Sequence, residues 1–257
     1  MPYRIRCLSI TPIKGLQLQH PTSVDITASG VPGDRQFHLV DATGALQSCT
    51  HNQALLTLRS EYDAAQRRLS VWRRDELLLS GVVEDGDPLE VDLHGLRTSP
   101  GAYVDGGWHD LFSDILGKPV RLVHAHTPAY DVFPATLVGS ASVAELARRS
   151  GLTGVDARRF RMLIEFEGGE AHAEDGWQGQ EIAVGSTVLR GGGLVKRCAA
   201  TTRHPDSGQV DLQTLRRIIG YRGRQETPLG PGAAFGVYAT VVTAGTVSIG
   251  DVLTISG

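Results

Sequence analysis

The sequence predicts a mainly β fold with a few helices, in which short strands curve strongly enough to close into a barrel. Segments that alternate apolar and polar residues recur along the chain, with turn residues roughly every 8–12 positions. Glycine is abundant at 31 of 257 residues, and aromatic residues make up only 6%. Because glycine and short strands suit tight sheet curvature, we favour a barrel over a sandwich.

Strands are expected along both halves of the chain. The first covers residues 3–10, where apolar and polar side chains alternate until Pro12 and Gly15 end the pattern. In the first half, further strands are expected at 23–27, 36–41, 55–62, 68–72, 77–79, 89–93 and 96–98. In the second half they are expected at 120–124, 160–166, 187–190, 235–242 and 252–255.

Three segments have the apolar spacing of amphipathic helices, namely 108–116, 143–149 and 212–219. Gly117 and Gly151 are suitable stops for the first two, and Gly220 for the third. Ser140 or Ser142 is the expected N-cap of the second helix. The Gly-rich stretch 100–107 is the softest boundary between the first β-rich part and the remainder.

Composition excludes several classes of protein. The net charge of -3 and the pI of about 6.3 argue against a dedicated nucleic-acid binder. The chain has no apolar run of the roughly 18 residues that a membrane span needs, and no signal-peptide core follows Met1. We therefore expect a cytoplasmic protein that binds neither membrane nor nucleic acid.

Cys198 is the residue around which we expect any chemistry to centre. It follows Lys196 and Arg197, and two nearby cations favour the thiolate, which attacks electrophiles and binds metals. The other interpretation is a small buried apolar side chain, as most single cysteines are. Cys7 is expected in the core, and Cys49 could border a pocket. No Cys-x-x-Cys pair encodes a zinc knuckle or a redox dithiol.

Several cations stand beside turns. Lys14 precedes Gly15, and Arg35 follows Gly33, an arrangement that can hold a phosphate. For Lys14 and Arg35 the alternative is a solvated surface charge. Arg161 at the start of an expected strand could clamp an anion or simply pair with Glu165 or Glu167. Neither a P-loop, nor a zinc helix, nor a serine-hydrolase elbow occurs. The residues alone therefore indicate a β-rich protein with one distinctive thiol, and they do not name a reaction.

The order of these motifs resembles the MOSC-domain proteins, the family of the molybdenum cofactor sulfurase C-terminal domain. The likeness is greatest to the members with an N-terminal MOSC β-barrel domain, such as the mitochondrial amidoxime-reducing component and its bacterial relatives. The matching segments lie along nearly the whole chain at 10–15, 33–40, 140–142, 159–161, 172–177 and 197–208. The last of these contains Arg197-Cys198, Thr201 and Pro205-Asp206-Ser207-Gly208.

The resemblance implies an N-terminal β-barrel-like domain at residues 1–100 and a MOSC domain at 101–257, related to the pyruvate-kinase β-barrel, with the two packed as one unit. It also implies a molybdenum cofactor (molybdopterin) bound through Cys198 as metal ligand. Cofactor contacts are expected from Lys14, Arg35, Ser140, Arg161 and Arg197. Such enzymes reduce N-hydroxylated small molecules, with electrons from a separate donor protein.

Two positions depart from the family pattern. Leu163 stands where the enzymatic relatives often have an asparagine, and Thr50 and His51 stand near the place of an expected arginine. Both changes remove polar cofactor contacts. The alternative is therefore a molybdenum-free MOSC protein that transfers sulfur on Cys198 or binds an anionic small molecule. A third possibility, a structural protein without a pocket, requires Lys14, Arg35 and Arg161 to lie far apart.

Overall fold

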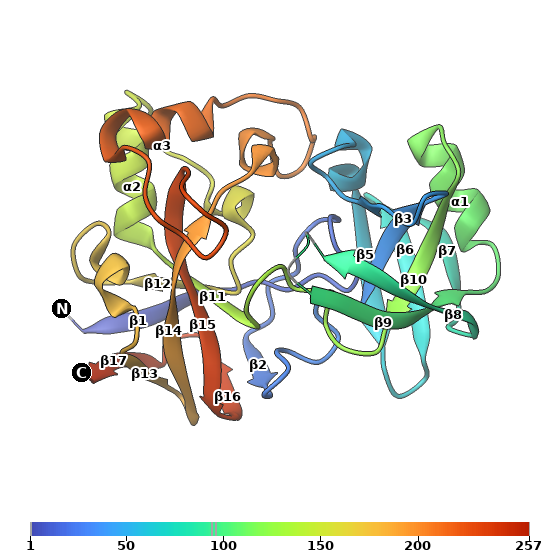
Figure 1. Cartoon of the computed structure of the whole chain (residues 1–257), viewed down its shortest axis with the longest axis horizontal. Coiled ribbons are helices and arrows are strands. Elements are labelled where there is room, and N and C mark those ends of the chain that lie inside the picture. Colours follow the sequence, from blue (N-terminus) through green and yellow to red (C-terminus); the bar gives the residue numbers. More distant parts are fainter. Residues whose placement is uncertain (1, 94, 96, 257) are drawn as a thin grey trace.

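The computed structural model describes residues 2–93, 95 and 97–256. Figure 1 shows two β-rich parts side by side, with the N- and C-termini at the edge of the same part. Strand β1 from the start of the chain lies beside β17 from its end, in register through Tyr3 and Leu253. The predicted mainly β, barrel-containing fold is confirmed.

Seven strands among the described residues close into a barrel, in the order β1-β12-β11-β15-β14-β13-β17. Neighbouring strands are antiparallel except β11 and β12, which are parallel. Their bounds are β1 Tyr3–Leu8, β11 Ala135–Gly139, β12 Ile164–Glu167, β13 Glu181–Val184, β14 Thr187–Lys196, β15 Ala234–Thr243 and β17 Val252–Ser256. A two-stranded sheet of β2 (Ser23–Ile26) and β16 (Gly245–Ser248) lies against the barrel and shares its apolar core.

The other part contains two smaller sheets. One has the order β4-β3-β10-β9-β8 and the other β5-β6-β7. Their bounds are β3 Phe37–Asp41, β4 Leu46–Gln47, β5 Leu58–Asp63, β6 Arg68–Arg73, β7 Glu76–Val82, β8 Asp85–Leu93, β9 Arg97–Val104 and β10 Val120–Ala125. Helix α1 (Trp108–Leu116) packs against them and ends at Gly117, as the sequence predicts.

Two helices cover one side of the barrel: α2 (Ser140–Arg149) and α3 (Thr214–Arg222). The remaining helical turns are short 3-10 segments, η1 Gln53–Thr57, η2 Ala157–Phe160, η3 Ala173–Trp177 and η4 Ala199–Thr202. Among the described residues, no helix is both long and apolar enough to cross a membrane.

The motif at 172–177 has a structural role. Glu174 is fully buried at the start of α2, where its carboxylate accepts hydrogen bonds from Ser142 Oγ (2.8 Å) and Gly139 N (3.2 Å). Asp175 accepts from Arg222 of α3 at 2.6 Å. Trp177 packs in the barrel core against Tyr3. The motif therefore connects both helices to the barrel.

The structure corrects three local predictions. The stretch 100–107 is no soft boundary, because strand β9 runs through it and pairs with β8 and β10 on its two sides. Helix α2 begins at Ser140 itself, and no side chain caps it. Helix α3 passes through Gly220 and ends at Gly223, since a glycine inside a helix is tolerated at modest cost.

A buried histidine yields a first prediction. His38 on β3 is fully buried, and neither ring nitrogen has a hydrogen-bond partner among the described residues. Burial, aided by Lys14 and Arg97, lowers its pKa to about 3. The unfolded histidine takes up a proton below about pH 6.5, so the stability due to the neutral ring is present above that pH and is lost as pH falls.

We expect this loss to reach about 2 kcal/mol at pH 5, from the difference between the folded and unfolded pKa values of this group. His38→Phe should therefore weaken the acid dependence of the unfolding free energy in urea titrations between pH 7 and pH 5. The same substitution at the exposed His126 is the control. An unchanged acid dependence in His38→Phe would contradict this account.

Candidate functional site

Five of the six predicted site residues line one cavity of about 280 Å³. They come from the loop after β1, the turn before β3, the end of η2 and the end of β14. The five are Lys14, Arg35, Arg161, Arg197 and Cys198. Since the cations converge with the thiol, the interpretation as a structural protein without a pocket is wrong.

Cys198 presents an exposed thiol to this cavity. It is the N-cap residue of η4, and its backbone carbonyl accepts hydrogen bonds from the amide and hydroxyl of Thr201, at 3.2 and 2.9 Å. Its Sγ lies 3.7 Å from Thr50 Oγ1. The backbone of Cys198 is thus held by its own helical turn, while its sulfur remains available to a ligand.

Lys14 lies on the cavity wall and is only 8% exposed. Its ammonium donates to Ala129 O at 2.6 Å and forms an ion pair with Asp131. Its backbone amide donates to Phe37 O at 2.8 Å, which fixes the loop after β1 against β3. Through these two contacts, the ammonium of Lys14 holds the segment 129–131 at the cavity wall.

Arg35 and Arg161 lie next to each other in the cavity wall. The guanidinium of Arg35 donates to the backbone carbonyl of Arg161 at 3.0 Å and pairs with Asp34. The guanidinium of Arg161 donates to Leu16 O at 2.7 Å, and burial lowers its pKa. Both arginines have positive φ, 50° and 54°, a conformation that non-glycine residues rarely adopt and that is often found at functional sites.

Arg197, the residue before Cys198, also lines the cavity. Its guanidinium donates to Phe160 O and contacts Met162 Sδ at 3.3 Å. Its Nε is buried and has no hydrogen-bond partner among the described residues. Burial lowers the pKa of Arg197. An incompletely bonded, buried cation of this kind favours an anionic partner.

Ser140 is the exception among the predicted site residues. Its hydroxyl donates to Glu165 Oε1 (2.8 Å) and Phe166 O (3.0 Å), and it lines a different surface depression beside Arg148. Since the first residue of α2 faces β12, the structure does not bring it to Cys198. We therefore drop Ser140 from the cofactor-binding set.

Two glycines let the segment around Cys49 lie close to the site. Gly15 has φ 98°, and a Cβ there would come within 3.1 Å of Cys49 N. Gly208, in the turn after η4, has φ 71°, and its Cβ would meet Gln53 O at 2.2 Å. Only glycine allows these approaches, so both motif glycines serve the packing of residues 48–53 against the cavity.

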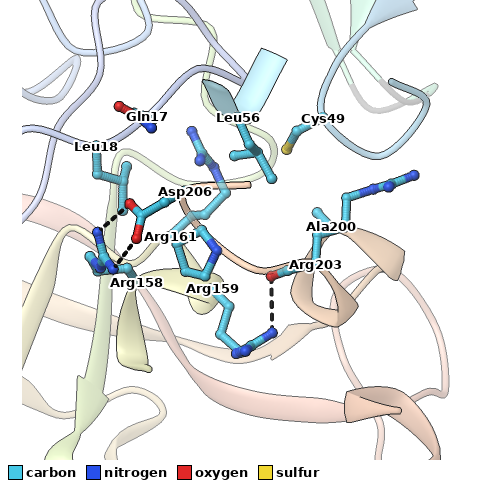
Figure 2. A pocket seen from close by; sticks show the side chains of 11 residues that line it. Gln17, Leu18, Cys49, Leu56, Arg158, Arg159, Arg161, Ala200, Arg203 and Asp206 are labelled. Atoms are coloured by element: carbon cyan, nitrogen blue, oxygen red, sulfur yellow. Dashed lines mark hydrogen bonds and ion pairs between the residues drawn. The ribbon is translucent and has the colours of Figure 1, made fainter. Parts of the chain in front are cut away.

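A second, smaller pocket of about 40 Å³ adjoins the cavity and shares Cys49, Arg161 and Ala200 with it. Figure 2 shows the other arginines around it, Arg158, Arg159 and Arg203. Arg158 pairs with Asp206, and Arg159 donates to Arg203 O at 2.9 Å. Arg158 also pairs with Asp156, and Arg159 with Asp211, so carboxylates balance much of the charge around this small pocket.

Several lining residues carried too weak a sequence signal to be predicted. Neither Asp131 nor Tyr238 belongs to a sequence motif that would single it out as a site residue. Tyr238 is buried, which with the nearby Asp131 raises its pKa to about 12, so it stays a hydrogen-bond donor. Arg203 donates to Thr50 O at 3.2 Å and brings a cation near the place where the family pattern expects one.

The cavity can hold an anionic small molecule against a thiol. Among the described residues that line it, five carry cationic side chains and one, Asp131, carries a carboxylate. Aromatic rings of Tyr130, Phe133 and Tyr238 complete the wall. Fold and site together define a β-barrel protein with a cavity that combines a cysteine with several cationic side chains.

Two family models match the chain. The MOSC domain matches residues 126–254, and the MOSC N-terminal beta barrel domain matches residues 3–119. The chain belongs to the MOSC-domain family. The predicted division at residue 100 stays a prediction; that residue lies inside β9, and the two matches would place a division later in the chain. Strand β1 lies within the match to the N-terminal domain, yet it completes the barrel whose other strands lie within or at the end of the MOSC match.

The relatives include amidoxime-reducing components. The human mitochondrial amidoxime-reducing component 1 is 24% identical over 95% of this chain and 80% of its own length. The human mitochondrial amidoxime reducing component 2 is 31% identical over 47% of this chain and 36% of its own length. A crystal structure of the YUAD protein from Bacillus subtilis superposes with a TM-score of 0.49 at 14% identity, over 99% of this chain and 96% of that one.

The different exposure of the three thiols leads to a second prediction. Cys198 is exposed, Cys7 partly buried and Cys49 only 3% exposed. Burial raises the pKa of both Cys49 and Cys7. In protein made without added molybdate, Ellman's reagent should therefore modify one thiol quickly, and all three only in denaturant.

Cys198→Ser should remove the fast phase of this reaction, and Cys7→Ser should keep it. A fast phase that survives in Cys198→Ser would show that another thiol is the accessible one.

Proposed function

We propose that this protein is a molybdenum-cofactor-dependent reductase of N-hydroxylated small molecules, with Cys198 as the protein ligand of the metal. The observation that carries the proposal is the convergence of Cys198 with four cations on one cavity. The family membership and the amidoxime-reducing relatives support the same function. A single thiolate does not retain a bare metal ion, so the cofactor would provide the other ligands.

The donor set fits the anionic cofactor in charge and in chemistry. The buried and unpartnered Nε of Arg197 can donate to an anionic group. Arg161 and Arg35 lie in the cavity wall with only part of their donors used by the protein. At Leu163 the fit is poorer, because this side chain is buried in the barrel core and offers no hydrogen bond.

Each group in the cavity has a distinct task under this proposal. The Cys198 thiolate would hold the metal, and the bound cofactor would supply the redox chemistry that reduces an N–O bond. Arg161 and Arg197 neutralise the anionic part of the cofactor, and burial in a poorly solvated wall strengthens these contacts.

Other groups shape the space for the substrate. Asp131 fixes the ammonium of Lys14 and leaves it directed along the wall. Tyr130, Phe133 and Tyr238 contribute aromatic side chains to the wall of the same cavity. Tyr238 remains protonated at neutral pH, because burial raises its pKa to about 12, and its hydroxyl can donate to a substrate oxygen. Electrons would come from a separate donor protein, and the cytoplasmic location stays a prediction.

Metal content tests the proposal. Protein expressed with molybdate in a host that makes the cofactor should contain about one molybdenum atom per chain. Cys198→Ala should lose both the metal and the reduction of benzamidoxime with a reduced viologen as electron donor. Arg161→Met should lower metal content, because a buried apolar side chain cannot hold the anionic cofactor.

Cys7→Ser is the matched control, since Cys7 lies on β1 outside the cavity, and it should retain the metal. Full activity in metal-free protein, or full molybdenum content in Cys198→Ala, would overturn the proposal.

The alternative is sulfur transfer on Cys198 without molybdenum, and the apolar Leu163 is the observation that favours it. In that case the purified protein should carry one additional sulfur on Cys198, seen by intact mass, that a reductant removes.

A further inference from the structure

Two of the three cysteines meet at the same cavity, although they are far apart in the sequence. Cys49 and Cys198 both line it, whereas Cys7 lies elsewhere on β1. Cys49 also lines the small arginine-lined pocket, where Figure 2 shows its sulfur next to Leu56. The cavity thus contains a buried thiol as well as an exposed one.

The segment that carries Cys49 is held against Cys198 by several independent contacts. Thr50, the next residue, places its Oγ1 3.7 Å from Cys198 Sγ. The carbonyl of Thr50 accepts from Arg203 at 3.2 Å, and Arg203 follows η4. Gly15 and Gly208 allow the backbone on either side of this segment to approach closely. The two thiols therefore share one small and well-packed region.

We propose that Cys49 is the resolving thiol for Cys198, so that oxidation of Cys198 by a peroxide closes a Cys49–Cys198 disulfide across the cavity. The exposed sulfur meets the oxidant first, because Cys49 is only 3% exposed. Cys49 is the other cysteine that lines the same cavity among the described residues, so its thiol is the candidate partner for the oxidised sulfur. The disulfide would connect the β4–η1 segment to the end of β14.

The chemistry is balanced with hydrogen peroxide as the oxidant. The Cys198 thiol takes one oxygen from the peroxide to give a sulfenic acid and one water. The Cys49 sulfur then attacks the sulfenic sulfur, the S–O bond breaks, and the hydroxyl leaves as a second water with the thiol proton. The two thiols lose two electrons and the peroxide gains them.

This inference goes beyond the proposed reductase and does not depend on it. A disulfide would occupy the Cys198 sulfur and close the site to any ligand of that sulfur, whether metal or sulfur atom. It would also protect Cys198 from irreversible oxidation to sulfinic acid. The cavity would thereby be switched off reversibly under oxidising conditions.

The test uses full-length protein made without added molybdate, reduced, desalted and treated with a small excess of hydrogen peroxide. Trypsin cuts after Arg35, Arg59, Arg197 and Arg203, so the disulfide would join peptides 36–59 and 198–203. We expect this joined pair as the main oxidation product of wild type, with a loss of two hydrogens in intact mass that dithiothreitol reverses. Cys7→Ser should behave like wild type.

In Cys49→Ser the joined pair should be absent, and Cys198 should instead accumulate as sulfinic acid. The proposal is overturned if wild type yields sulfinic acid at Cys198 without the joined peptides, or if Cys49→Ser is protected from that oxidation as well as wild type is. The thermal unfolding midpoint of reduced Cys49→Ser shows whether the variant is folded. If Cys49→Ser is unfolded, the experiment is repeated with Cys49→Ala, and the same two outcomes decide the proposal.

Discussion

The buried guanidinium of Arg161 is the contact on which the architecture of the site depends. It donates to the carbonyl of Leu16, while the Arg161 carbonyl accepts from Arg35. One residue therefore connects the loop after β1, the turn before β3 and the end of η2. Figure 2 shows it beside Cys49 at the small pocket. Because a buried cation needs its hydrogen bonds, these segments are held in one arrangement around the cavity.

The other cations also hold segments of the chain in place, because each donates to a backbone carbonyl. Lys14 holds the segment 129–131, Arg197 holds Phe160, and Arg203 holds Thr50. Each uses some donors on the protein and leaves others for a ligand. The positive charge around Cys198 is thus fixed in place before any ligand arrives, which lowers the cost of ordering side chains on binding. In this site the groups that shape the cavity are also those that attract an anion.

Much of this could be predicted from the sequence because it depends on local signals. Helix α1 was predictable from its apolar spacing and Gly117, and the curved β fold from short strands and glycine. The motif around Cys198 indicated a privileged thiol, and the resemblance added Lys14, Arg35 and Arg161. The start of β9 was predicted at 96–98, but its continuation to Val104 was missed where Gly-rich sequence was interpreted as a loop, since pairing on both sides overrode the local preference.

The remaining features depend on contacts between distant segments. Asp131 has no distinctive neighbours in the sequence, and only the fold brings it to the cavity of Cys198. The sequence indicated that Cys49 could border a pocket, but not that Cys198 lines the same one. Ser140 was wrongly assigned to the cofactor site, because a motif match does not show which way a side chain at the start of a helix points. The contact of Arg203 with the carbonyl of Thr50 likewise joins two segments that are far apart in the sequence.

The central claim is that the Cys198 sulfur holds the metal inside the cation-lined cavity. Crystals of protein from a cofactor-producing host, measured on both sides of the molybdenum absorption edge, test it most directly. The account predicts one anomalous peak per chain within bonding distance of Cys198 Sγ, with cofactor density toward Arg161 and Arg197. A molybdenum peak elsewhere, or cofactor density that avoids these arginines, would contradict it.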